Sequence, residues 1–108
     1  MKLIIAIIQD DDAGDVISAL NNASFQVTRL STKGGFLRSG NTTILAGVED
    51  VKVDEALKLI EKNSKVRTQY ATLPSSSAAM HGFLLAPIEV KVGGATVFVL
   101  DVEQFHKY

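Results

Sequence analysis

The sequence predicts a single α+β domain that spans residues 1–108. Three observations support this class: a continuous aliphatic run at residues 3–8, two later stretches with apolar residues at helical spacing, and several segments rich in β-branched residues. With 46% hydrophobic and 21% charged residues, the composition is that of an ordinary globular domain. A chain of this size forms only a modest core, so association with other copies would help to stabilise it.

The first predicted elements are a strand, a helix and a long hairpin. The run Leu3–Ile8 is typical of a central strand that is buried on both faces. The acidic residues after it suit the start of a helix, with Asp10 or Asp11 as its cap. The apolar residues that follow share one helical face: Ala13, Val16, Ile17 and Leu20. Residues 25–30 form the next expected strand, which pairs with residues 42–48 across a glycine-rich loop.

The second half of the chain predicts a helix followed by three strands. Asp50 is the expected cap of the helix. Its buried stripe consists of Val53, Ala56, Leu57 and Ile60. Strands are expected at 66–72, 88–92 and 95–100, and Gly93-Gly94 reads as a two-residue hairpin turn between the last two. The tail at 103–108 is expected to form a short turn or helix.

These elements follow the order βαββαβ, with an additional terminal hairpin. The first six match the ferredoxin-like split βαβ arrangement, in which two helices cover one face of an antiparallel sheet. The other face is uncovered in a single chain. Because its strands carry many apolar residues, we expect the protein to self-associate.

Composition and charge exclude several classes of function. A net charge of −1 argues against a surface built for nucleic acid or for a membrane of anionic lipid. The absence of cysteine excludes disulfides and thiolate zinc sites. The first apolar run is too short to span a membrane, and acidic residues follow it where a signal peptide has small ones, so we expect a cytoplasmic protein. No hydrolase or phosphoryl-transfer motif is present, and we predict neither an enzyme nor a cofactor.

The loop at residues 32–41 is the most informative segment for function. Its glycines permit positive φ angles, so successive backbone amides can converge on an anion. Arg38 can add a charge-assisted hydrogen bond to phosphate, and Phe36 can lie against a base. The side-chain amide of Asn41 offers the donor and acceptor that an adenine edge requires. A plain hairpin loop with a solvated arginine is the alternative.

Three other segments allow two interpretations each. Ser24, Gln26 and Thr28 alternate along one strand face, where polar residues are either solvated or in contact with a ligand. The segment at 73–86 lacks periodicity and carries apolar side chains, which either close on a ligand or partner, or pack against this sheet or a neighbouring subunit. Residues 10–12 offer three carboxylates, but helix capping explains them better than a metal site because adjacent helical residues point in different directions.

Four stretches resemble the PII-like cyclic-di-AMP receptors: Met1–Asp10, Gly34–Thr43, Val92–Val99 and Gln104–His106. The resemblance extends over nearly the whole chain. It implies a homotrimer with three cyclic-di-AMP sites, one at each subunit interface. It also implies that two loops, 34–41 and 73–86, respond to the ligand.

The resemblance assigns ligand contacts by position: Thr28, Gly35, Phe36, Leu37, Asn41, Gly47 and Phe98. Asn41 and the backbone of Gly47 would read adenine, while Thr28 and the amides near residues 36 and 37 would lie near ribose or phosphate. Ser24 and Gln26 stand where members commonly carry asparagine and arginine. The loss of a cation beside a dianionic ligand is expected to lower its affinity.

The leading interpretation is therefore a signal receptor that passes a loop rearrangement to an unidentified downstream protein. A trimeric interaction module that has lost its ligand is a second interpretation, which Ser24 and Gln26 favour. An acylphosphatase-like enzyme is disfavoured. The phosphate loop of those enzymes follows the first strand, where the carboxylates of residues 10–12 would repel a phosphate.

Overall fold

The structure is a computed structural model, and it describes residues 1–30, 40–71 and 88–108. The segment at 73–86 and most of the glycine-rich loop lie outside these ranges. The elements are β1 (Lys2–Gln9), α1 (Asp10–Asn22), β2 (Thr28–Leu30), β3 (Asn41–Val48), the 3₁₀ turn η1 (Asp50–Lys52), α2 (Val53–Ser64), β4 (Arg67–Ala71), β5 (Ile88–Val92) and β6 (Ala95–Asp101). In the described residues, no helix has both the length and the apolar character needed to cross a bilayer.

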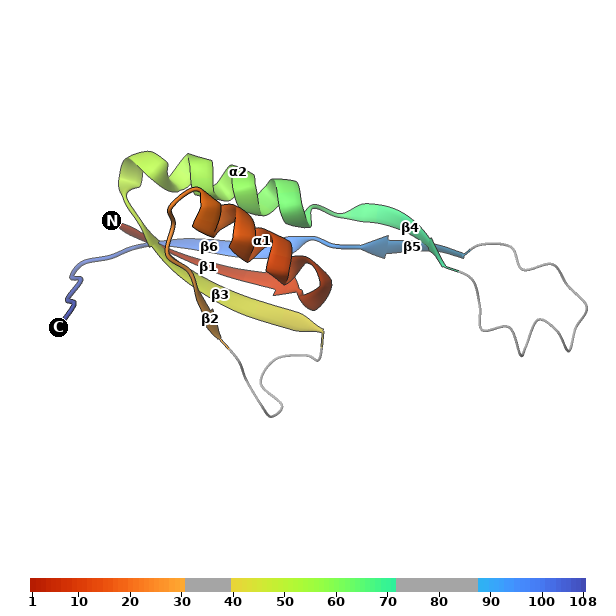
Figure 1. Cartoon of the computed structure of the whole chain (residues 1–108), viewed down its shortest axis with the longest axis horizontal. Helices are drawn as coiled ribbons and strands as arrows, with labels where there is room; N and C mark the ends of the chain where they lie inside the picture. The colour runs from red at the N-terminus through yellow and green to blue at the C-terminus, as the bar shows by residue number, and fades with distance from the viewer. Residues whose placement is uncertain (31–39, 72–87) are drawn as a thin grey trace, which may run out of the picture.

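Four strands form an antiparallel sheet in the order β2-β3-β1-β6, and both helices cover one of its faces (Figure 1). The α+β class, the two helices and the antiparallel sheet are thus confirmed. The strand order is that of the ferredoxin-like arrangement, with β6 as its fourth strand. The aliphatic strand β1 lies in the centre, as its sequence predicts.

The predicted terminal hairpin at Gly93-Gly94 is wrong, and so is the predicted place of β4 in the main sheet. β5 pairs with β4 in a separate two-stranded sheet, whereas β6 pairs with β1. We call this two-stranded sheet the arm; it projects past the end of α2 (Figure 1). Both glycines have positive φ angles, 85° and 94°, as a hairpin turn also requires. Here, however, the amide of Gly93 donates to the side chain of Gln9, and that of Gly94 to the Ser64 carbonyl.

The core lies between the helices and the sheet, and both predicted helical stripes contribute to it. Its buried residues are Ile4, Ala6, Ile8, Val16, Leu20, Phe25, Ile44, Ala46, Val48, Ala56 and Ile60. The prediction that β1 is buried on both faces is wrong for one chain, because Leu3, Ile5 and Ile7 are only half-buried. The strand expected at 25–30 is confined to β2, since Phe25 packs into the core before the strand begins. The tail at 103–108 forms neither helix nor strand.

The predicted side-chain caps do not form. Gln9 occupies the cap position of α1, and Asp10 instead accepts a hydrogen bond from the Thr42 hydroxyl at 2.5 Å. Asp50 begins η1 and pairs with the N-terminal amine at 2.9 Å. This contact lowers the pKa of the Asp50 carboxyl, chiefly through the hydrogen bond. The carboxylates of the first turn of α1 still lie at the positive end of the helix dipole.

The joint between β5 and β6 has no room for a side chain at Gly93. A Cβ there would lie 2.6 Å from the Lys65 carbonyl oxygen and 2.7 Å from Nη1 of Arg67. We expect Gly93→Ala to lower the free energy of unfolding by about 1–3 kcal/mol from backbone conformation alone, with the clash in addition. Gly14→Ala is the matched control, because nothing lies within 4 Å of a Cβ in that helix.

The control should raise the free energy of unfolding by about 0.5–1 kcal/mol, the helix propensity difference. Urea denaturation followed by circular dichroism measures both variants. If Gly93→Ala were as stable as the wild type, the joint would not impose this conformation.

Candidate functional site

The face of the main sheet that points away from the helices, here called the open face, gathers most of the described site candidates. Opposite residues of an antiparallel pair share a face, and alternate residues of β1 point into the core. The register therefore places on the open face Leu3, Ile5, Ile7, Thr28, Leu30, Asn41, Thr43, Leu45, Gly47, Thr96, Phe98 and Leu100. Four predicted contacts are among them: Thr28, Asn41, Gly47 and Phe98.

A groove of about 510 Å³ lies beside one end of the open face. It is lined by Met1, Leu3, Gln26, Thr28, Leu45, Gly47, Val102 and Phe105. Three residues singled out in the sequence, Gln26, Thr28 and Gly47, thus meet at one site. None of the lining residues has a charged side chain. A Cβ at Gly47 would meet only Sδ of Met1, at 3.8 Å, so the missing side chain leaves open space in the groove.

The sequence did not single out the apolar part of the groove. Leu3 and Leu45 could have been found, since strand alternation places both on the open face. Val102 and Phe105 could not, because their position depends on the path of the chain after β6. The Val102 amide donates to the Met1 carbonyl at 3.2 Å, which keeps this segment beside the start of β1.

Asn41 lies at the other end of β3. It is six positions from Gly47 along the strand, a distance of roughly 20 Å. It lines a hollow of about 400 Å³ with Gln9, Asp10, Asp11 and Gly40. The two carboxylates make this hollow unfavourable for a phosphate, so a neutral base suits it better. One chain therefore does not bring Asn41 and Gly47 to the same base.

Phe98 lies between these two ends of the open face. It is opposite Ile5, which is opposite Leu45 on the other side. Half of the Phe98 surface, 50%, is exposed in the single chain. The middle of the open face is therefore an apolar platform with an aromatic ring, a surface that suits a flat base or another subunit.

The alternation predicted that Ser24 shares a strand face with Gln26 and Thr28. This prediction is wrong. Ser24 lies in the turn after α1 with φ of 69°, and its amide donates to the Asn21 carbonyl at 3.0 Å. The left-handed conformation favours asparagine or glycine over other residues. Ser24 therefore belongs to the turn, and it does not line the groove.

The remaining predicted contacts, Gly35, Phe36, Leu37 and Arg38, lie outside the described residues and stay predictions.

The three acidic residues of the β1–α1 junction have three different environments. Asp10 accepts a hydrogen bond from Thr42, Asp11 is exposed, and Asp12 pairs with Arg67. Their divergence agrees with the expectation that adjacent helical carboxylates point in different directions.

Comparison with known proteins identifies the family of the chain. The family model described as "Cyclic-di-AMP receptor" matches residues 1–108. The chain belongs to the cyclic-di-AMP receptor family, and the resemblance seen in the sequence is confirmed. A crystal structure of a functionally unknown protein from Pediococcus pentosaceus ATCC 25745 is similar: it is 43% identical, the match covers 99% of this chain and 96% of that one, and the TM-score is 0.77.

Proposed function

We propose that this protein is a signal receptor that binds cyclic-di-AMP on the open face, between the subunits of a homotrimer. One observation carries the proposal. In a chain of the cyclic-di-AMP receptor family, the groove gathers two residues that the resemblance assigns to the ligand, Thr28 and Gly47, together with Gln26. Ser24 and Gln26 are two positions at which this chain differs from the pattern of the family. Of the two, Gln26 lines the groove and Ser24 does not, so we expect Gln26 to affect the ligand.

The separation within β3 supports a site between subunits. Asn41 and Gly47 are roughly 20 Å apart along the strand, far more than the width of a purine. If both read the same adenine, they come from different copies of the chain. The half-exposed apolar residues of the open face, Phe98 and Leu100 among them, give those copies a surface to bury.

The chemistry of each part suggests how the ligand is oriented. Leu3 and Leu45 offer apolar contact to a base, and the exposed backbone at Gly47 can bond its edge without interference from a side chain. The Thr28 hydroxyl suits the ribose. No side chain among the described groove residues supplies a cation to the two phosphates, and the predicted phosphate contacts are Arg38 and the amides near residues 36 and 37. The ligand would act on the loops at 34–41 and 73–86, and these on a downstream protein.

Light scattering and calorimetric titration test this proposal together. We expect a mass about three times that of the 11.6 kDa chain, since closed cyclic assemblies are favoured. We also expect saturable binding of cyclic-di-AMP, with much weaker binding of cyclic-di-GMP and ATP. A monomer would contradict the site between subunits. A trimer without saturable binding would indicate an interaction module instead of a receptor.

Gly47→Val tests whether the groove itself holds the ligand. Valine suits a strand, and its methyl groups would occupy space that is open in the wild type. We expect the fold and the oligomer mass to be retained, while affinity for cyclic-di-AMP falls at least about tenfold. Gly14→Ala, on the helix side, is the control and should bind as the wild type does. Unchanged affinity of Gly47→Val would place the ligand elsewhere.

Gln26→Arg tests the electrostatics of the groove. An arginine offers a planar fork of donors and a charge to a ligand with two phosphates. We expect it to improve binding by about 1–2 kcal/mol, or about five- to thirtyfold, and to make the affinity more sensitive to salt. Gln69→Arg adds the same charge on the arm and should change neither. Equal gains in both variants would show a general charge effect in place of a contact at residue 26.

A further inference from the structure

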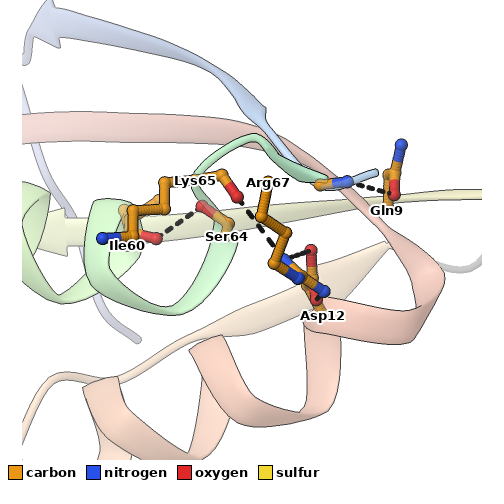
Figure 2. A network of polar contacts seen from close by, with 7 residues as sticks. Gln9, Asp12, Ile60, Ser64, Lys65 and Arg67 are labelled. Atoms are coloured by element: carbon orange, nitrogen blue, oxygen red, sulfur yellow. Dashed lines mark hydrogen bonds and ion pairs between the residues drawn. The ribbon is translucent and has the colours of Figure 1, made fainter. Parts of the chain in front are cut away.

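The arm is held at its base by a partly buried ion pair. Arg67, the first residue of β4, donates from Nη2 to Oδ1 of Asp12 at 2.7 Å and from Nη1 to Oδ2 at 3.2 Å (Figure 2). The Asp12 side chain is 5% exposed and that of Arg67 is 40% exposed. The hydrogen bond to Asp12 is the main reason that the pKa of Arg67 is raised. A bidentate contact of this kind fixes direction as well as distance.

The second strand of the arm is held from the same side. Gln9 accepts, through Oε1, a hydrogen bond from the amide of Gly93 at 2.8 Å, directly after β5 (Figure 2). The Gly94 amide donates to the carbonyl of Ser64, at the end of α2. Both strands of the arm therefore meet residues of one short segment, 9–12, which we call the corner.

The corner also holds the beginning of β3. The Asp10 amide donates to the Gly40 carbonyl at 2.8 Å, and its carboxylate accepts from the Thr42 hydroxyl at 2.5 Å. Gly40 and Thr42 flank Asn41, which the proposed function assigns to adenine. One acidic residue thus fixes both sequence neighbours of Asn41.

No loop separates these contacts. β1 ends at Gln9 and α1 begins at Asp10, so the corner passes directly from strand to helix. We propose that the corner is a mechanical coupler: it fixes the position of Asn41 and the direction of the arm through one rigid turn, so that displacement of one displaces the other. This goes beyond the proposed function, and it rests on that function only for the ligand at Asn41. Packed elements of this kind shift between discrete arrangements instead of deforming gradually.

The first test needs no ligand. Thr42→Val removes the hydroxyl that binds Asp10 but leaves the shape of the side chain. We expect amide hydrogen exchange in β4 and β5 to become at least about threefold faster, because the corner loses one of its two hydrogen bonds to the start of β3. Thr43→Val is the matched control: within the described residues, that hydroxyl makes no hydrogen bond to the corner. Thr42→Ser keeps the hydroxyl and should restore the slow exchange.

Faster exchange in the arm for Thr42→Val alone supports the coupling. Unchanged exchange overturns it, and so does an equal effect in Thr43→Val. Arg67→Gln should accelerate exchange in the arm directly, at least about tenfold, because it leaves the Asp12 carboxylate without its partner. Asp54→Asn removes an exposed carboxylate at the start of α2, far from Arg67 along that helix, and should leave the arm unchanged.

The second test adds cyclic-di-AMP. In the wild type, the ligand should change the exchange of the arm amides. Arg67→Gln lies outside the groove and should bind within about threefold of the wild type, yet the ligand should no longer affect its arm. An equal ligand effect on the arm of Arg67→Gln overturns the coupling. If the wild type does not bind cyclic-di-AMP, the proposed function fails, while the ligand-free exchange of Thr42→Val still decides whether the corner is a coupler.

Discussion

The pairing of Asp12 with Arg67 is the interaction on which the arm and its connection to the main sheet depend. A carboxylate at 3% residue exposure is unfavourable unless it is paired, and Arg67 supplies both the charge and two donors. Because only two residues lie between the end of α2 and Arg67, the first residue of β4, this pairing directs β4 past the edge of the main sheet. The returning chain must then pass close to the end of α2, where only a glycine fits at residue 93. With β4 directed away, the fourth position of the main sheet is taken by β6, and the chain returns to it from the arm through the glycine joint.

The main sheet divides its residues between two environments. On the helix side, Ile4, Ala6 and Ile8 are almost fully buried, and the core is closed within one chain. On the open face, the alternate residues of the same strand are half-buried, and the edge of the face opens into the groove. The same two-residue period therefore separates the part of the protein that stabilises a single chain from the part available to ligand and to other subunits.

Local periodicity accounts for what the sequence predicted well. The stripes of α1 and α2 and the central position of β1 follow from apolar spacing within each segment. The partners of β4 and β6 could not be predicted in this way, because both segments have ordinary strand patterns and long-range contacts decide between them. The hairpin predicted at Gly93-Gly94 was wrong for a related reason. A hairpin turn and a connection between two sheets both require glycines with positive φ angles. At the site, Thr28 and Gly47 were found by family likeness, whereas Phe105 depends on the path of the chain beyond the last strand.

The pairing of β1 with β6 has a consequence for how the chain reaches its fold. Lys2 and Asp101, which lie opposite each other in this pair and also form an ion pair, are separated by 99 positions in the sequence. During synthesis, β1 has an unpaired edge until β6 has emerged, although α1, β3 and α2 can already pack against it. Contacts so distant in sequence form slowly, because the intervening chain must first be ordered. An apolar strand with an open edge is also a site where nascent chains aggregate. Completion of the sheet by β6 is therefore expected to be the slow step of folding, during which the edge of β1 is exposed to other chains.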